Sequence, residues 1–274
     1  MQLLNNWYSL LLTEVAAYFT STTLFVSILK NAPSLSWLMK YGGHDNFGLK
    51  PPLIATKLEV PKRWFWHFYA FISLLNPLFT FFILNTNFPI PIFKNIKEDL
   101  MYSKKLQVLL LIYEIHTLRR LYENLRFRKS GSKMLAGHYL LGYLFYTHTF
   151  LALLLCGRRS YENTMSSMQF VGLGIYAIGS IWQNASHEHL IAQKNHSQYL
   201  VLKKGCFKWI TGPHYLGEII VYTGIALIAQ HWLIWLVLGW VLCNMVAISS
   251  SYACTVKNKE QSLDFRWTLI PFLY

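Results

Sequence analysis

Seven apolar stretches long enough to cross a membrane recur along this chain, and polar connections separate them. About 20 consecutive apolar residues are needed for a helix to cross the hydrocarbon core of a bilayer. Windows of that length predict helices at 7–29, 64–85, 105–125, 134–156, 166–186, 213–229 and 232–253. The pattern therefore predicts one all-α integral membrane domain over residues 1–274, with seven transmembrane helices.

Lysine and arginine are distributed unevenly over the predicted connections. Cytosolic loops of membrane proteins carry the excess of these residues. With the N-terminus in the lumen, the cytosolic loops and tail hold 17 of them, against 6 on the lumenal side when Lys105 at a helix boundary is included. The sequence thus predicts a lumenal N-terminus and a cytosolic C-terminus.

The composition agrees with a membrane protein, because 54% of the residues are hydrophobic and only 14% are charged. A soluble domain of this size needs more charge on its surface. The net charge of +13 is explained mainly by the Lys and Arg residues of the predicted cytosolic loops. It would attract anionic lipid headgroups or a phosphorylated cofactor. No recognised nucleic-acid-binding motif accompanies this charge, so we expect no nucleic acid as a partner.

Polar and titratable residues interrupt or flank the apolar runs in the last third of the chain, in WQNASHEHL at 182–190 and GPHYLGEII at 212–220. In hydrocarbon such residues are expensive and usually functional. Gln183, His187 and Lys194 could hydrogen-bond a nucleotide at the cytosolic opening. His187 and His189 are two residues apart on a helix and point in nearly opposite directions, so we expect no metal site.

A second polar group lies in the helix predicted at 105–125. On a helical period, His116, Arg120 and Glu123 share one face, whereas Glu114 lies well around from it. Such a face can bind a phosphate or a polar headgroup. The alternative is that these arginines merely extend from a helix end towards the aqueous interface.

Four sequence blocks occur in a fixed order: LEVPKRWFWHFY at 58–69, HTLRRLYE at 116–123, GPHYLGE at 212–218 and LIPFLY at 269–274. Together they resemble the steroid 5α-reductase family, and in particular its polyprenol (polyprenal) reductase branch. The resemblance implies a multi-pass protein of the endoplasmic reticulum membrane with NADPH as its cofactor. It also implies reduction of the α-isoprene double bond of polyprenal or polyprenol, which leads to dolichol for protein N-glycosylation.

The resemblance also assigns roles to single positions. Glu59 matches the glutamate that faces the reacting end of the substrate. His116 precedes Thr117, where steroid-type members have a catalytic tyrosine, so His116 becomes the expected donor or acid for the carbonyl. The expected cofactor-binding residues are Arg120, Gln183, His187, Lys194, Tyr199, His214, Gly217 and Glu218. The tail departs from the family pattern, with Ser251 and Thr255 in place of a histidine and a tyrosine.

Two other classes of protein remain compatible with these residues. An isoprenylcysteine-type membrane methyltransferase shares the polar C-terminal helix pair and would bind S-adenosylmethionine. A membrane scaffold without catalysis would keep its function when His214 or Glu218 is replaced. The reductase interpretation requires a long-chain polyisoprenoid substrate within the membrane lipid, and no protein partner is indicated.

Overall fold

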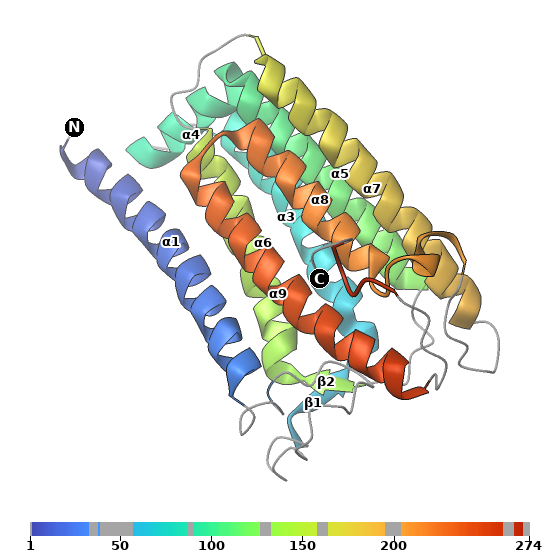
Figure 1. The fold of residues 1–274 in the computed structure, drawn as a ribbon. Coiled ribbons are helices and arrows are strands. Elements are labelled where there is room, and N and C mark those ends of the chain that lie inside the picture. The colour runs from blue at the N-terminus through green and yellow to red at the C-terminus, as the bar shows by residue number, and fades with distance from the viewer. Residues whose placement is uncertain are drawn as a thin grey trace.

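The structure is a computed structural model of the chain, and it describes residues 2–32, 38, 57–86, 90–126, 133–157, 164–194, 204–259 and 266–270. Within these residues, long helices lie side by side in a bundle with α1 at one edge (Figure 1). The α-helices are α1 (Gln2–Asn31), α3 (Trp66–Asn85), α4 (Pro91–Tyr102), α5 (Lys104–Arg126), α6 (Ala136–Cys156), α7 (Ser167–Lys194), α8 (Pro213–Ala229) and α9 (Trp232–Lys259). Short 3-10 turns, η2 (Lys62–Phe65) and η3 (Gly205–Lys208), precede α3 and α8.

Each of the seven predicted membrane segments overlaps one long helix. Four helical segments of the described chain are long and apolar enough to cross a bilayer: Trp7–Asn31, Lys62–Asn85, Ala136–Cys156 and Trp232–Ala253. α8 is apolar but has only 17 residues, whereas α5 and α7 carry charged and polar side chains. The prediction of an all-α membrane protein is therefore confirmed. α7 continues past its predicted end at 186 and reaches Lys194.

α4 occupies part of the connection that was predicted between the second and third helices. It begins with Pro91, a residue whose missing N–H costs little at the start of a helix. Asp99 and Leu100 are buried, while Met101 and Tyr102 are exposed. A 12-residue helix that mixes apolar and charged positions escapes a search for 20 apolar residues.

Two three-residue strands join the starts of α3 and α6. β1 (Glu59–Pro61) pairs antiparallel with β2 (Lys133–Leu135), and Glu59 lies opposite Leu135. The pairing is extended by a hydrogen bond of 2.7 Å from Ala136 N to Leu58 O. Strands this short cannot show the alternating pattern that predicts a strand. Together with an isolated bridge between Ile210 and Trp267, they are the β-structure of the described residues.

α7 and α8 pack backbone to backbone through glycines. A Cβ atom added to Gly224 would lie 2.6 Å from Tyr176 N, and one added to Gly179 would lie 2.7 Å from Val221 N. Because no side chain separates the two helices there, their backbones come unusually close. This packing sets the last turns of α7 against the first turns of α8.

Residues 266–270 run beside the segment that leads into α8. Trp267 N donates to Trp209 O at 2.9 Å, and Thr211 N donates to Trp267 O at 2.8 Å. Leu269 is fully buried. These contacts fix the chain just before Pro213, where α8 begins.

Candidate active site

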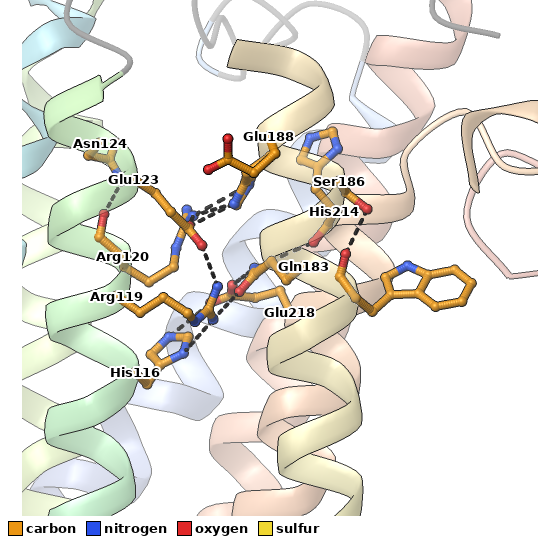
Figure 2. Close-up of polar contacts among 12 residues, drawn as sticks. His116, Arg119, Arg120, Glu123, Asn124, Gln183, Ser186, Glu188, His214 and Glu218 are labelled. Carbon is orange, nitrogen blue, oxygen red and sulfur yellow. Dashed lines mark hydrogen bonds and ion pairs between the residues drawn. The ribbon is translucent and has the colours of Figure 1, made fainter. Parts of the chain in front are cut away.

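Three helices bring eight polar residues together near the start of α8 (Figure 2). The residues lie in the C-terminal halves of α5 and α7 and in the first turns of α8. The helical spacings i, i+3, i+4 and i+7 place the α5 members on one side of that helix. This polar cluster consists of His116, Arg119, Arg120 and Glu123 from α5, Gln183 and His187 from α7, and His214 and Glu218 from α8.

Glu123 is fully buried and accepts hydrogen bonds from three side chains. Arg119 Nη1 lies 2.6 Å from Oε1, while Arg120 Nη1 at 2.5 Å and His187 Nδ1 at 2.7 Å approach Oε2. A His187 Nδ1 that donates to Glu123 carries a proton, so the nearby Arg120 Nη1 at 2.9 Å contacts this nitrogen without donating to it. One carboxylate therefore binds two guanidinium groups and orients an imidazole.

Glu218 links α8 to the other two helices. Its Oε2 accepts a hydrogen bond from Gln183 Nε2, and Gln183 Oε1 accepts one of 2.5 Å from Arg119 Nη2. Arg119 Nη2 also lies 3.3 Å from His116 Nδ1. Because a guanidinium only donates, His116 Nδ1 is the acceptor and the neutral imidazole carries its proton on Nε2. That nitrogen faces Glu218 Oε1 at 3.6 Å.

A cavity of about 390 Å³ adjoins the polar cluster. At its polar end it is lined by Arg120, Gln183, His187, His214 and Glu218. Away from the cluster the wall is mainly apolar and is supplied by α1, α3, α6 and α9. This part, called the apolar arm below, includes Phe25, Val26, Phe145, Trp240, Val241 and Met245. One cavity thus joins a charged, hydrogen-bonding end to a hydrocarbon-like space.

Most of the predicted site residues meet at this place: His116, Arg120, Gln183, His187, His214, Gly217 and Glu218. Glu59 does not join them, because it lies in β1 and is not among the described residues that line the cavity. Its strand partner Leu135 does line it. Lys194 ends α7, and its side chain, like all of Tyr199, lies outside the described residues.

The predicted orientation of other polar residues is confirmed. Glu114 is turned away from the polar cluster and accepts a hydrogen bond of 2.9 Å from Asn76 Nδ2 of α3. His187 faces Glu123 of α5. His189 lies instead beside Gly205, since a Cβ atom added to Gly205 would lie 2.8 Å from His189 Nε2.

The two tail positions that depart from the family pattern lie in α9. Ser251 Oγ donates to Ala247 O at 3.2 Å, and the Thr255 side chain lies outside the described residues.

Three residues of the site were not among the predicted site residues. Arg119 contacts three members of the polar cluster, and its i, i+4 spacing to Glu123 is the signal that could have indicated it. Tyr69 and Tyr146 line the cavity next to Arg120, with their ring centroids 5.0 Å apart. The Arg120 guanidinium lies 5.4 Å from the Tyr69 ring centroid. Tyr146 sits in an apolar helix without any motif, so only the fold reveals it.

Gly217 makes room for α7. A Cβ atom at this position would lie 2.7 Å from Gln183 Cβ and 2.9 Å from its Cα. We expect Gly217→Ala to push α7 from α8, to displace Gln183 from Glu218, and to destabilise the protein by about 1–3 kcal/mol. Thermal unfolding in detergent, together with an activity assay, measures both effects.

Gly239→Ala is the matched control for Gly217→Ala. Gly239 is also a glycine within a helix, but a Cβ atom there would have no atom of the described residues within 4 Å. This change should be neutral or slightly stabilising, since alanine favours helix more than glycine does. Equal unfolding temperatures and equal activities of the two variants would contradict the role given to Gly217.

Several buried nitrogen atoms of the polar cluster have no hydrogen-bond partner among the described residues: His116 Nε2, Arg119 Nε, Arg120 Nε and His214 Nδ1. Buried polar atoms without partners are costly, and a bound ligand can satisfy them. Arg120 and His214 line the cavity, and a guanidinium group is well suited to phosphate. The polar end therefore fits a phosphorylated ligand that also carries hydrogen-bonding groups.

Residues 130–274 match the family described as 3-oxo-5-alpha-steroid 4-dehydrogenase. The chain belongs to this family. The matched region of the 3-oxo-5-alpha-steroid 4-dehydrogenase family contains α6 to α9, and hence the Gln183, His187, His214 and Glu218 side chains of the polar cluster. α5, which supplies the two arginines, precedes it.

Relatives of this family extend the similarity over most of the chain. The polyprenal reductase of Saccharomyces cerevisiae is 31% identical over 222 residues, which is 79% of this chain and 76% of the yeast protein. The polyprenal reductase of Drosophila melanogaster is 27% identical, with 77% of this chain and 75% of that protein covered. The one from Ailuropoda melanoleuca is 23% identical over 99% of this chain and 96% of its own length. The resemblance found in the four sequence blocks is thereby confirmed.

Proposed function

We propose that this protein is an NADPH-dependent reductase of the endoplasmic reticulum membrane that reduces the α-isoprene double bond of polyprenal and so leads to dolichol. The family membership and the relatives named polyprenal reductase support this reaction. The observation that carries it is the cavity, because its charged end suits a dinucleotide and its apolar arm suits an isoprenoid chain.

All seven predicted segments are included in the proposed topology, with the N-terminus in the lumen and the C-terminus in the cytosol. The excess of Lys and Arg in the proposed cytosolic connections supports this orientation. In α5 and α7, the charged and amide side chains of the polar cluster face the bundle and bind one another. A polar side chain that is paired inside a bundle is compatible with a membrane-spanning helix. The polar cluster then opens towards the cytosol, where NADPH is available.

The cofactor supplies a hydride when bound. On the protein side, Arg120 offers positive charge at the cavity wall, while Gln183 and His214 offer hydrogen-bonding groups. His187 is held by Glu123, which orients its ring. Lys194 and Tyr199 remain proposed cofactor-binding residues on the basis of the family resemblance, and Gly217 and Glu218 complete the set.

Reduction of a conjugated double bond builds negative charge on the carbonyl oxygen and requires a proton at the α carbon. Glu218 lines the cavity, whereas His116 is fully buried and is not among the described residues of its wall. The two side chains are 3.6 Å apart and form a pair that can hold and pass a proton. The hydroxyls of Tyr69 and Tyr146 are further candidates to donate to the carbonyl oxygen, because both residues line the cavity. Glu59 is retained as a proposed substrate-facing residue on the family resemblance.

The test is an assay of purified protein in lipid nanodiscs, with polyprenal and polyprenol offered separately and with NADPH and NADH compared. We expect dolichal from polyprenal with NADPH, and much slower conversion with NADH. Folded protein that fails to convert polyprenal would exclude the proposed reaction. Binding of S-adenosylmethionine to the same preparation would favour the methyltransferase alternative instead.

A further inference from the structure

Away from the polar cluster, one ionisable pair joins α1 to α6 within two apolar segments. Glu14 lies inside Trp7–Asn31 and His148 inside Ala136–Cys156, both of which are long and apolar enough to cross a membrane. Glu14 Oε1 is 2.9 Å from His148 Nε2. The Glu14 side chain is 54% exposed and that of His148 is 12% exposed. A carboxyl group facing hydrocarbon is costly unless a partner compensates it.

The hydrogen bonds of His148 show that this pair shares one proton. His148 Nδ1 lies 2.6 Å from Leu144 O, and a carbonyl oxygen only accepts, so Nδ1 carries a proton. The contact between Nε2 and Glu14 Oε1 then contains one proton, on either the imidazole or the carboxyl group. Both arrangements leave the pair neutral overall. The contact is therefore a strong hydrogen bond that suits a membrane interior.

α1 is less enclosed by the protein than the other candidate membrane spans. Only 17% of its membrane-length window is buried in the protein, compared with 33% to 56% for the other three candidate spans. Tyr8 OH donates to Leu155 O at 3.2 Å and provides a second link to α6. At the spacing of a helix, the stripe that begins with Glu14 and Tyr18 continues to Thr22, Phe25 and Leu29.

That stripe leads directly to the apolar arm, since Thr22, Phe25, Val26 and Leu29 line the cavity. The rings of Tyr18 and His148 stack with centroids 3.9 Å apart. The next residue, Phe19, packs edge-on against Phe145, and Phe145 stacks on Trp240 at 4.3 Å. Phe145 and Trp240 are themselves part of the cavity wall. The position of Glu14 is thus coupled by direct packing to both sides of the apolar arm.

We propose that Glu14 and His148 are a positioning pair that holds α1 as the outer wall of the apolar arm, and so determines how well the enzyme binds the long isoprenoid chain of its substrate. This inference rests on the proposed function for the identity of the ligand. Neither residue lines the cavity among the described residues, so the pair acts on the chain of the substrate through α1 and leaves the reacting end untouched.

The experiment compares Glu14→Ala, His148→Ala and the double variant with Glu14→Gln in nanodiscs. Glutamine can donate to His148 Nε2, so it should preserve the contact. The matched control is Thr13→Ala, because Thr13 is exposed on the same helix and its hydroxyl donates to Ser9 O of its own helix at 2.7 Å. The readouts are kcat and KM for a long-chain and a short-chain polyprenal, and equilibrium crosslinking to a long-chain polyprenol that carries a photoreactive diazirine.

Each alanine variant should raise KM for the long-chain aldehyde about three- to tenfold, the range for an interhelical hydrogen bond in a membrane. KM for the short-chain aldehyde and both kcat values should change little. The double variant should be no worse than either single one, and Glu14→Gln and Thr13→Ala should resemble the unaltered protein. Crosslinking of the probe should weaken in parallel with KM.

A loss of kcat, an equal rise of KM for both aldehydes, or unchanged crosslinking in the alanine variants would overturn the proposal. Failure of the proposed function gives a different result, namely that the unaltered protein reduces neither aldehyde. The crosslinking series still decides the role of the pair in that case, because it requires no turnover.

Discussion

Replacement of Glu123 by alanine is expected to destabilise the folded protein by about 3–5 kcal/mol, the range for removal of one partner from a buried ion pair. Glu123 is fully buried, and it is contacted by Arg119, Arg120 and His187. The side chains of the two arginines are only 16% and 15% exposed. Without the carboxylate, two guanidinium groups remain in the bundle with little water to solvate them. Unfolding in detergent and the yield of monodisperse protein measure the loss.

Glu188→Ala is the control for Glu123→Ala, because it breaks an ion pair between the same two helices at an exposed position. Glu188 pairs with Arg126, and their side chains are 41% and 37% exposed. Because water solvates both groups of an exposed pair, its loss should lower stability far less than the loss of Glu123. Similar losses in the two variants would contradict the distinction between a buried and a solvated pair.

Replacement of Glu218 by glutamine is expected to lower kcat/KM for polyprenal by at least about 100-fold, the lower range for loss of a positioned acid or base. Glutamine has nearly the same shape and can still accept from Gln183, so the fold should be kept. It cannot hold a negative charge opposite His116 Nε2, which lies 3.6 Å from the Glu218 carboxylate. Steady-state kinetics with polyprenal and NADPH measure the effect, and unfolding in detergent confirms that the protein is folded.

Glu114→Gln provides the comparison for Glu218→Gln. Glu114 lies on another face of α5, where its carboxylate binds Asn76, and it does not line the cavity among the described residues. Glutamine can accept the same hydrogen bond, so activity should stay within about twofold, consistent with the small effect of changes away from a site. If Glu218→Gln kept full activity, the proposed chemical role of Glu218 would be wrong.

The helices could be predicted because a long apolar segment that crosses a membrane must satisfy its own backbone hydrogen bonds, and a helix does so within one segment. The same search missed α4, a 12-residue helix of mixed character, and it missed β1 and β2, which are three residues each. It also ended α7 and α9 too early, at 186 and 253, whereas they reach Lys194 and Lys259. The polar stretch before Lys194 looks like a loop when its partner on α5 is not known.

Part of the site could be predicted from the sequence, and the signal that indicated each residue was not the same for all of them. His116, Arg120 and Glu123 follow from helical spacing within one segment. Gln183, His187, His214 and Glu218 are conspicuous because they flank apolar runs, and the family resemblance assigned most of them to the cofactor. Gly217 was predicted as a cofactor-binding residue from the family resemblance alone, and only the structure shows that its missing side chain also makes room for Gln183 of α7.

By itself, the sequence determined that this is a helical membrane protein of a reductase family, with its candidate polar residues in segments 116–123, 182–190 and 212–220. The length of an apolar segment and the residues of a local motif are properties of contiguous residues, so they can be recognised without knowledge of the fold. The tertiary structure alone decided which polar residues share hydrogen bonds, that Tyr69 and Tyr146 line the same cavity, and that Glu14 meets His148 across 134 positions of the chain. Those contacts depend on how helices far apart in sequence are packed, because each one is formed by two surfaces that no single segment contains.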